Sequence, residues 1–263
     1  MNKIALIVLA SISSLTLLAK ENVGNTNTSN SQTSLARVAA DCTPSQAKTD
    51  LNINNVRTTI MGAADMWWNL SDARYEIPKN SNKHSMFAGA LWIAGIDAGE
   101  QLKAAAMTYR QTGNDFWTGP LDPSGEIDAE TCNEYDKHFV VTRQEVDEFI
   151  AWFNDNDAYP DYSIPLSILN WPGNGVNGDY QFLAPYYDAN DDGDYNPSDG
   201  DYPKYDIEGN LDCNNDDLIY GDQTLYWIFN DKGNIHSETG ADPIGLEIRA
   251  QAFAFATNDE INN

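Results

Sequence analysis

Hydrophobic and polar residues alternate along much of the chain from residue 51 onward, and this two-residue period predicts β-strands. Strands are expected at 56–60 and 224–229, and a hairpin is expected where 86–96 and 101–109 flank the turn 97–100. Glycine and proline are frequent between these segments, which is typical of tight turns. The pattern predicts a mainly β fold in which antiparallel sheets pack in a sandwich-like way.

The longest alternating stretch is the last one, GLEIRAQAFAFAT at residues 245–257. It places Leu246, Ile248 and Ala250 on one face and charged or amide side chains on the other, as expected for a half-buried strand. Only six residues follow it. We therefore expect either a fragment of a longer protein, truncated at its C-terminus, or a sheet whose edge is completed by a partner.

One segment has a helical period. Thr142 and Glu145 form a capping-box pattern, and apolar residues follow at helical spacing from Val146 to Phe153. The sequence therefore predicts one short helix at about 143–153, packed on a sheet.

The beginning of the chain is typical of a secreted protein. Residues 1–19 combine Lys3 with a short apolar run, which predicts a cleaved signal peptide rather than a membrane anchor. Residues 20–50 are rich in Asn, Ser and Thr and predict a flexible leader. We expect 51–263 to form a single β-rich domain, with no membrane insertion after cleavage.

The charge is strongly acidic: 40 Asp and Glu against 15 Lys and Arg give a formal net charge of −25. This balance excludes a protein that grips nucleic-acid phosphates and disfavours binding to anionic lipid. Sixteen of the acids lie in the segment 154–222, where Lys204 is the single basic residue. The spacing of acids within that segment suggests a metal site.

Residues 188–199 read DANDDGDYNPSD and match a twelve-residue EF-hand-type calcium loop. Alternating short oxygen-bearing side chains can wrap one Ca²⁺, and Gly193 permits the sharp turn at position 6. The closing residue is Asp rather than Glu, and proline and glycine in the flanks argue against paired EF-hand helices. The alternative is a loop of Asx turns without an ion. The predicted ligands are Asp188, Asn190, Asp192, Asp194 (through its carbonyl), Asn196 and Asp199.

A second acidic group lies at Asp212, Asn214, Asp216 and Asp217. It has no glycine at the corresponding offset, so a solvated surface is favoured over a second calcium site.

The chain has three cysteines, Cys42, Cys132 and Cys213, so at least one has no partner within the chain. Secretion makes disulfides possible. We expect Cys132–Cys213 as the pair. No two cysteines have the spacing of a zinc site.

Three motifs of common catalytic chemistry are absent from the sequence: G-x-S-x-G, H-E-x-x-H and the P-loop. The three histidines have no paired-ligand spacing. Tryptophans could stack on sugars, but in β proteins they mostly fill cores. The tryptophans considered for this role are Trp67, Trp68, Trp92, Trp117, Trp171 and Trp227.

Several stretches resemble the N-terminal region of large secreted proteins of Bacteroidota, which commonly carry a C-terminal type IX secretion sorting domain. This resemblance implies an extracellular location, with possible attachment to the bacterial outer surface, and it implies no activity. The stretches are MWWNL (66–70), residues 83–117, IDAETCNEYDKHF (127–139), DANDDGDYNPSDGDYP (188–203) and residues 221–263.

Together these features favour a non-enzymatic, calcium-stabilised module of a cell-surface structural or adhesion protein. Its partner would be a glycan, another protein or the C-terminal continuation of the same protein. The alternative is a carbohydrate-active domain that binds or hydrolyses glycans with tryptophans beside paired carboxylates.

Overall fold

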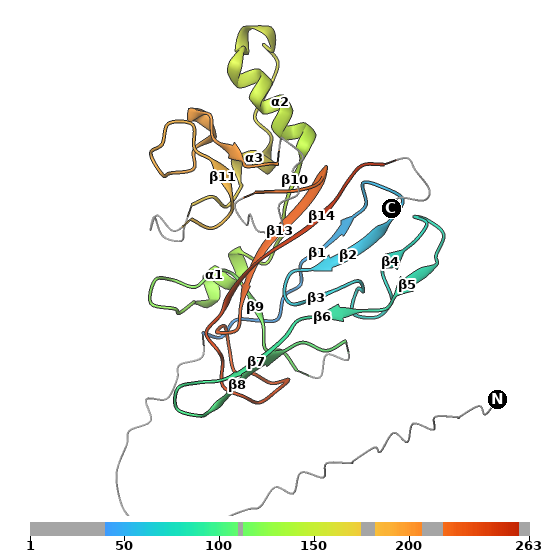
Figure 1. Ribbon diagram of the computed structural model, residues 1–263, viewed down its shortest axis with the longest axis vertical. Coiled ribbons are helices and arrows are strands. Elements are labelled where there is room, and N and C mark those ends of the chain that lie inside the picture. The colour runs from blue at the N-terminus through green and yellow to red at the C-terminus, as the bar shows by residue number, and fades with distance from the viewer. Residues whose placement is uncertain (1–39, 110–112, 175–181, 207–217, 258–263) are drawn as a thin grey trace, which may run out of the picture. The chain divides into compact units, whose positions relative to one another are not determined.

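The structure is a computed structural model, and it describes residues 40–109, 113–174, 182–206 and 218–257 (Figure 1). These residues belong to one structural unit. They form antiparallel sheets with short helices, which confirms the predicted mainly β fold.

The first sheet has six strands in the order β5-β4-β2-β3-β6, with β1 paired to β2. Strand β2 coincides with the strand predicted at 56–60. All but one of its residues are buried. The strands of this sheet are β1 (Lys48–Leu51), β2 (Arg57–Met61), β3 (Asp65–Met66), β4 (Tyr75–Glu76), β5 (His84–Met86) and β6 (Gly89–Ala90).

The second sheet is built around two long strands, β13 and β14, which pair along all eight residues of each (Figure 1). Strands β10 and β9 also pair with β13. The strands predicted at 224–229 and 245–257 are therefore confirmed. The strands are β9 (Trp117–Thr118), β10 (Phe139–Thr142), β13 (Gln223–Asn230) and β14 (Glu247–Ala254).

Strand β13 is buried on both faces. Leu225, Trp227 and Phe229 face a core shared with the first sheet, whereas Tyr226 and Ile228 face a second core. Side chains alternate across a strand, so a strand covered on both sides needs apolar residues at nearly every position. This explains the unbroken run TLYWIF and places β13 at the centre of the fold.

The predicted helix is α2 (Arg143–Asn154), and it begins with the predicted capping box. The Thr142 amide donates to the Glu145 carboxylate at 2.8 Å, and the Glu145 amide donates to the Thr142 hydroxyl at 3.2 Å. The described residues also hold helices that the sequence pattern did not predict, because each is too short to show a period. They are α1 (Ala129–Glu134), α3 (Leu166–Leu169) and the 3₁₀ turns η1 (Asn156–Ala158) and η3 (Pro197–Asp199).

The predicted hairpin is present as β7 (Trp92–Ile96) and β8 (Leu102–Ala106), which form a two-stranded sheet of their own. The Asp97 carboxylate closes the turn by accepting the Gly99 and Gln101 amides at 2.8 and 2.9 Å. The first predicted strand, 86–96, is broken into three pieces with different partners: β5 pairs with β4, β6 with β3 and β7 with β8.

The predicted disulfide is wrong: Cys42 is bonded to Cys132. Both cysteines are buried with Trp117 in a small core of their own, and the Cys42 amide donates to the Gly233 carbonyl at 3.1 Å. The segment that we expected to be a flexible leader therefore includes structured residues from 40 onward, among them strand β1. Cys213 lies outside the described residues.

Candidate functional site

The predicted calcium loop is closed at its base by two short strands rather than by helices. These are β11 (Tyr186–Tyr187) and β12 (Tyr202–Pro203), which pair in antiparallel fashion. The rings of Tyr187 and Tyr202 stack at 4.9 Å with an angle of 19° between their planes. The flanks thus lack the paired helices of an EF-hand, as the prolines and glycine of the sequence predicted.

Inside the loop, backbone amides point at the first predicted ligand. The Asp188 carboxylate accepts the Gly193 amide at 2.8 Å and the Asp192 amide at 3.3 Å. Gly193 has a φ of 78°, the left-handed conformation that position 6 of such a loop requires. Asp192 in turn accepts the Asp194 amide at 2.8 Å. These turns give the first half of the loop the curvature that a calcium loop needs.

The other predicted ligands make side-chain contacts with one another. The Asn190 amide group donates to Asp192 at 2.8 Å, and the Asn196 amide group donates to Asp199 at 2.6 Å. The Asp194 side chain is exposed. Within the described part of the chain, no three His, Cys, Asp or Glu side chains are grouped closely enough to hold a metal ion. The structure therefore brings the six residues into one loop without bringing their carboxylates together.

The donor set nevertheless fits calcium. Every side chain named in the loop offers a hard oxygen, and hard oxygens suit Ca²⁺ better than softer metals. The side-chain oxygens of Asn190 and Asn196 accept the backbone amides of Asp192 and Ser198, both at 3.1 Å.

Asp201, which follows the loop region, was not among the residues predicted from the sequence. Its side chain is buried, and it accepts the amides of Ala189 and Asn196, both at 2.8 Å, so it ties the two halves of the loop together. Burial raises the pKa of Asp201, and the nearby charges of Asp188 and Asp192 raise it further. It lies two residues beyond the twelve-residue pattern, so no spacing rule identified it.

The tryptophans are mostly core residues. The side chains of Trp68, Trp117, Trp171 and Trp227 are buried, whereas Trp92 is 70% exposed. Several indole N–H groups are satisfied internally; that of Trp171, for example, donates to the Pro185 carbonyl at 3.1 Å. The four buried tryptophans therefore pack in cores, as expected, and do not form a surface on which a sugar could stack. The second acidic group, at 212–217, lies outside the described residues.

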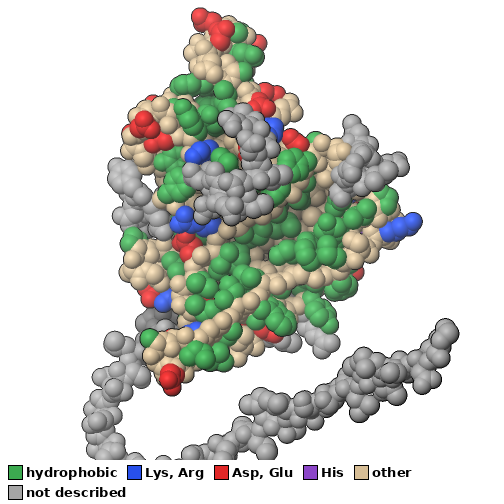
Figure 2. Space-filling model, in the orientation of Figure 1, with side chains coloured by type: hydrophobic (Ala, Val, Ile, Leu, Met, Phe, Trp, Pro, Cys, Tyr) green, Lys and Arg blue, Asp and Glu red, His purple; other side chains and the backbone are tan. Residues whose placement is uncertain are grey.

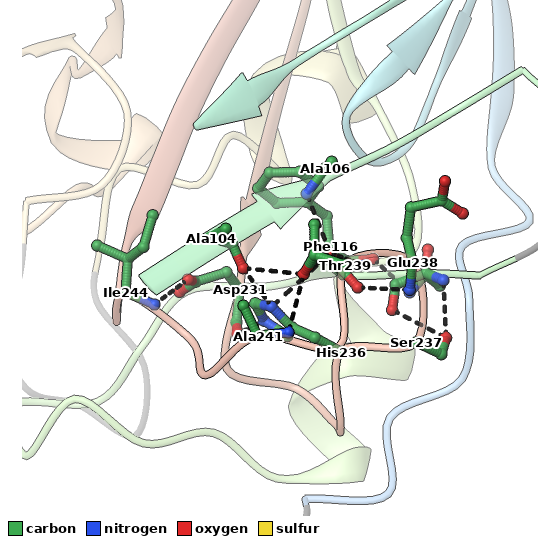
Figure 3. Close-up of polar contacts among 12 residues, drawn as sticks. Ala104, Ala106, Phe116, Asp231, His236, Ser237, Glu238, Thr239, Ala241 and Ile244 are labelled. Atoms are coloured by element: carbon green, nitrogen blue, oxygen red, sulfur yellow. Dashed lines mark hydrogen bonds and ion pairs between the residues drawn. The ribbon is translucent and has the colours of Figure 1, made fainter. Parts of the chain in front are cut away.

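A second concentration of buried polar groups lies below the sheets, where the loop between β13 and β14 meets β8 (Figure 3). Its centre is Asp115, which is fully buried. The Asp115 carboxylate accepts the amides of Ala106, Glu238 and Thr239 at 3.1, 2.9 and 3.1 Å and the Thr239 hydroxyl at 2.8 Å. A carboxylate so fully used by backbone donors acts as a structural anchor.

His236 and Asp231 complete this cluster, and both are buried. The ring nitrogens of His236 lie 2.7 Å from the carbonyl oxygens of Ala104 and Asp231. The Asp231 carboxylate accepts three successive amides and so fixes the chain as it enters β14. These belong to Ile244, Gly245 and Leu246. No sequence motif marks these residues, because each lies among other polar residues of the same loop.

His138 lies close to the first sheet and to Trp227, with the two ring centroids 5.4 Å apart. Burial lowers its pKa from 6.5 to about 4. The neutral ring is satisfied by two contacts: Nε2 donates to the Met61 carbonyl at 3.2 Å, and Nδ1 accepts the Thr49 hydroxyl at 2.9 Å. The folded protein therefore holds this ring uncharged, in contact with Thr49 of β1 and Met61 of β2.

This shift predicts acid sensitivity. A folded-state pKa below the unfolded value gives stability that is complete above about pH 6.5 and is lost as the pH falls toward about 4, with a loss of about 3 kcal/mol at most. We expect His138→Gln to flatten this part of the curve of unfolding free energy against pH, measured by urea denaturation. An NMR titration of the His138 ring with a midpoint near 6.5 would contradict the prediction.

Comparison with protein-family models, curated proteins and solved structures found no match. No helix of the described residues is long and apolar enough to cross a membrane.

Proposed function

We propose that this chain is a secreted, calcium-stabilised, β-rich module of a cell-surface structural or adhesion protein. The observation that carries the proposal is the loop at 188–199. Its first carboxylate, on Asp188, already accepts the amides of positions 5 and 6, and Gly193 already has the required left-handed backbone.

The electrostatics of the loop explain why an ion would be needed. Five carboxylates belong to this twelve-residue loop, and buried Asp201 follows it, in a chain with a net charge of −25. Like charges at short range destabilise the folded loop, and a bound divalent cation removes much of that repulsion. The ion would therefore stabilise the fold and supply no reaction. The five are Asp188, Asp191, Asp192, Asp194 and Asp199.

An extracellular location has independent support. The disulfide Cys42–Cys132 belongs to a class of bond that persists mainly in oxidising compartments. The apolar segment at 1–19 has the composition of a signal peptide. The resemblance to secreted Bacteroidota proteins agrees with both and suggests attachment to the cell surface.

The alternative function, a carbohydrate-active domain built on several tryptophans beside paired carboxylates, receives less support. Four of the seven tryptophans are buried in cores. Two of the buried carboxylates, Asp115 and Asp231, are saturated by backbone amides and so do not face a substrate. A glycan partner for a non-catalytic module remains compatible with this arrangement.

Calcium removal tests the proposal. At a calcium concentration of about a hundred times Kd, binding stabilises the fold by about 2.7 kcal/mol, so we expect EGTA to lower Tm by roughly 5–10 °C. Differential scanning calorimetry in calcium and in EGTA measures this shift. Limited proteolysis in EGTA should also cut within 185–206 first. An identical melting curve in both buffers would rule the proposal out.

A pair of charge-matched variants separates the site from general charge effects. Asp192→Asn removes a predicted ligand, whereas Asp161→Asn removes an exposed acid outside the loop. We expect the first variant to lose most of the calcium-dependent shift and the second to keep it. Equal calcium-dependent shifts in the two variants would place the ion elsewhere.

A further inference from the structure

The indole of Trp92 is exposed but held in place. Its side chain is 70% exposed, yet its Nε1–H donates to the Met107 carbonyl at 2.6 Å across the base of the β7–β8 hairpin. Exposure of an aromatic ring forgoes the large gain in stability that burial would give, and the other tryptophans are buried or partly buried. The hydrogen bond uses the polar edge of Trp92 and leaves the flat apolar surface of the ring to the solvent.

A second exposed aromatic ring, that of Tyr109, lines the same groove as Trp92. Tyr109 is 50% exposed, and Phe87 packs against it edge-to-face with ring centroids 5.9 Å apart. Trp92 and Tyr109 both line an open groove of about 580 Å³. This volume lies within the range of small-molecule sites. Figure 2 shows that hydrophobic side chains gather on the face of the molecule that includes the hairpin.

The groove also has polar groups. Thr108 and Glu238 line it beside the two rings. The backbone amide of Glu238 is held by buried Asp115, and in Figure 3 the Glu238 carboxylate points away from that buried cluster. The buried Asp115 carboxylate thus positions the backbone of Glu238 beside the groove.

The chemistry of the lining selects the ligand. A pyranose ring has an apolar face of C–H groups that stacks on an aromatic ring and a rim of hydroxyls that bonds to carboxylate and hydroxyl groups. The net charge of −25 repels anionic ligands, so acidic glycans do not fit. An uncharged sugar can stack on the flat aromatic rings and is not repelled by the negative charge of the protein.

We propose that the groove between residues 88–92 and 107–109, with Glu238, binds a neutral saccharide that stacks on Trp92. This inference goes beyond the proposed function and does not depend on the calcium loop. It makes this face of the module the point of contact with a glycan.

The test is a screen of the full chain on an array of neutral oligosaccharides, followed by NMR titration with the hit. Trp92→Ala should weaken binding at least tenfold, whereas Trp92→Phe should keep affinity within about threefold because it keeps a flat ring. Tyr159→Ala removes another exposed aromatic side chain, which lies outside the groove, and should leave affinity unchanged. Circular dichroism confirms that each variant is folded.

Absence of any hit among neutral oligosaccharides would overturn the proposal. So would a hit whose affinity is unchanged by Trp92→Ala, because the sugar would then bind elsewhere. Titration with tetramethylammonium tests whether the aromatic groove binds a cation in place of a sugar. Binding of this cation without binding of any sugar would identify an aromatic cation site instead. The calcium melting experiment is independent, so failure of either proposal leaves the other standing.

Discussion

Replacing both Cys42 and Cys132 with serine is expected to lower the free energy of unfolding by about 4–5 kcal/mol. The bond closes a loop between residues that are 90 positions apart, and it thereby restricts the unfolded chain. It also attaches the segment before β1 to helix α1, in a core shared with Trp117. For a domain of this size, the loss corresponds to a fall in Tm on the order of 10 °C or more, measurable by calorimetry.

Cys213→Ser is the matched control, because it removes a thiol and keeps the bridge. We expect it to melt like the wild type, and peptide mapping without reduction should recover Cys42 linked to Cys132. Recovery of a peptide that joins Cys132 to Cys213 would contradict the structure and restore the pairing expected from the sequence.

The strands were predictable where hydrophobic periodicity is strong. The run TLYWIF was assigned as a strand because it is aromatic and β-branched, and its burial on two faces follows from its position between two cores. Helix α2 was predictable because the capping box and the spacing of the apolar residues both indicate a helix that begins after Thr142. The short pieces β5 and β6 were not, since two or three residues carry no measurable period and their pairing depends on distant strands.

The candidate site, too, could be predicted only in part from the sequence. The turn at Gly193 follows from local spacing, so the sequence predicted it correctly. Asp201 and Asp115 are single acids among 40, and only the tertiary structure distinguishes them from the exposed ones. The wrong disulfide has a similar cause: sequence separation says little about which cysteines meet when the chain folds.

Asp115→Ala is expected to destabilise the fold by about 4 kcal/mol. The side chain is fully buried and accepts three backbone amides and the Thr239 hydroxyl, so its removal leaves several buried donors without partners. Each such group costs about 1–3 kcal/mol, and relaxation of the loop recovers part of the sum. Guanidinium denaturation measures the loss, and hydrogen exchange should show lower protection at the amides of Ala106, Glu238 and Thr239.

Asp122→Ala is the matched control for this prediction. Asp122 also accepts two backbone amides and a hydroxyl, from Ser124 and Glu126, but on the exposed surface. Water can replace its hydrogen bonds, so the same substitution should cost far less there. Similar losses at Asp115 and Asp122 would mean that the buried cluster opens to water in solution. In that case its amides would not anchor the loop between β13 and β14, and the groove beside Glu238 would lose its rigid support.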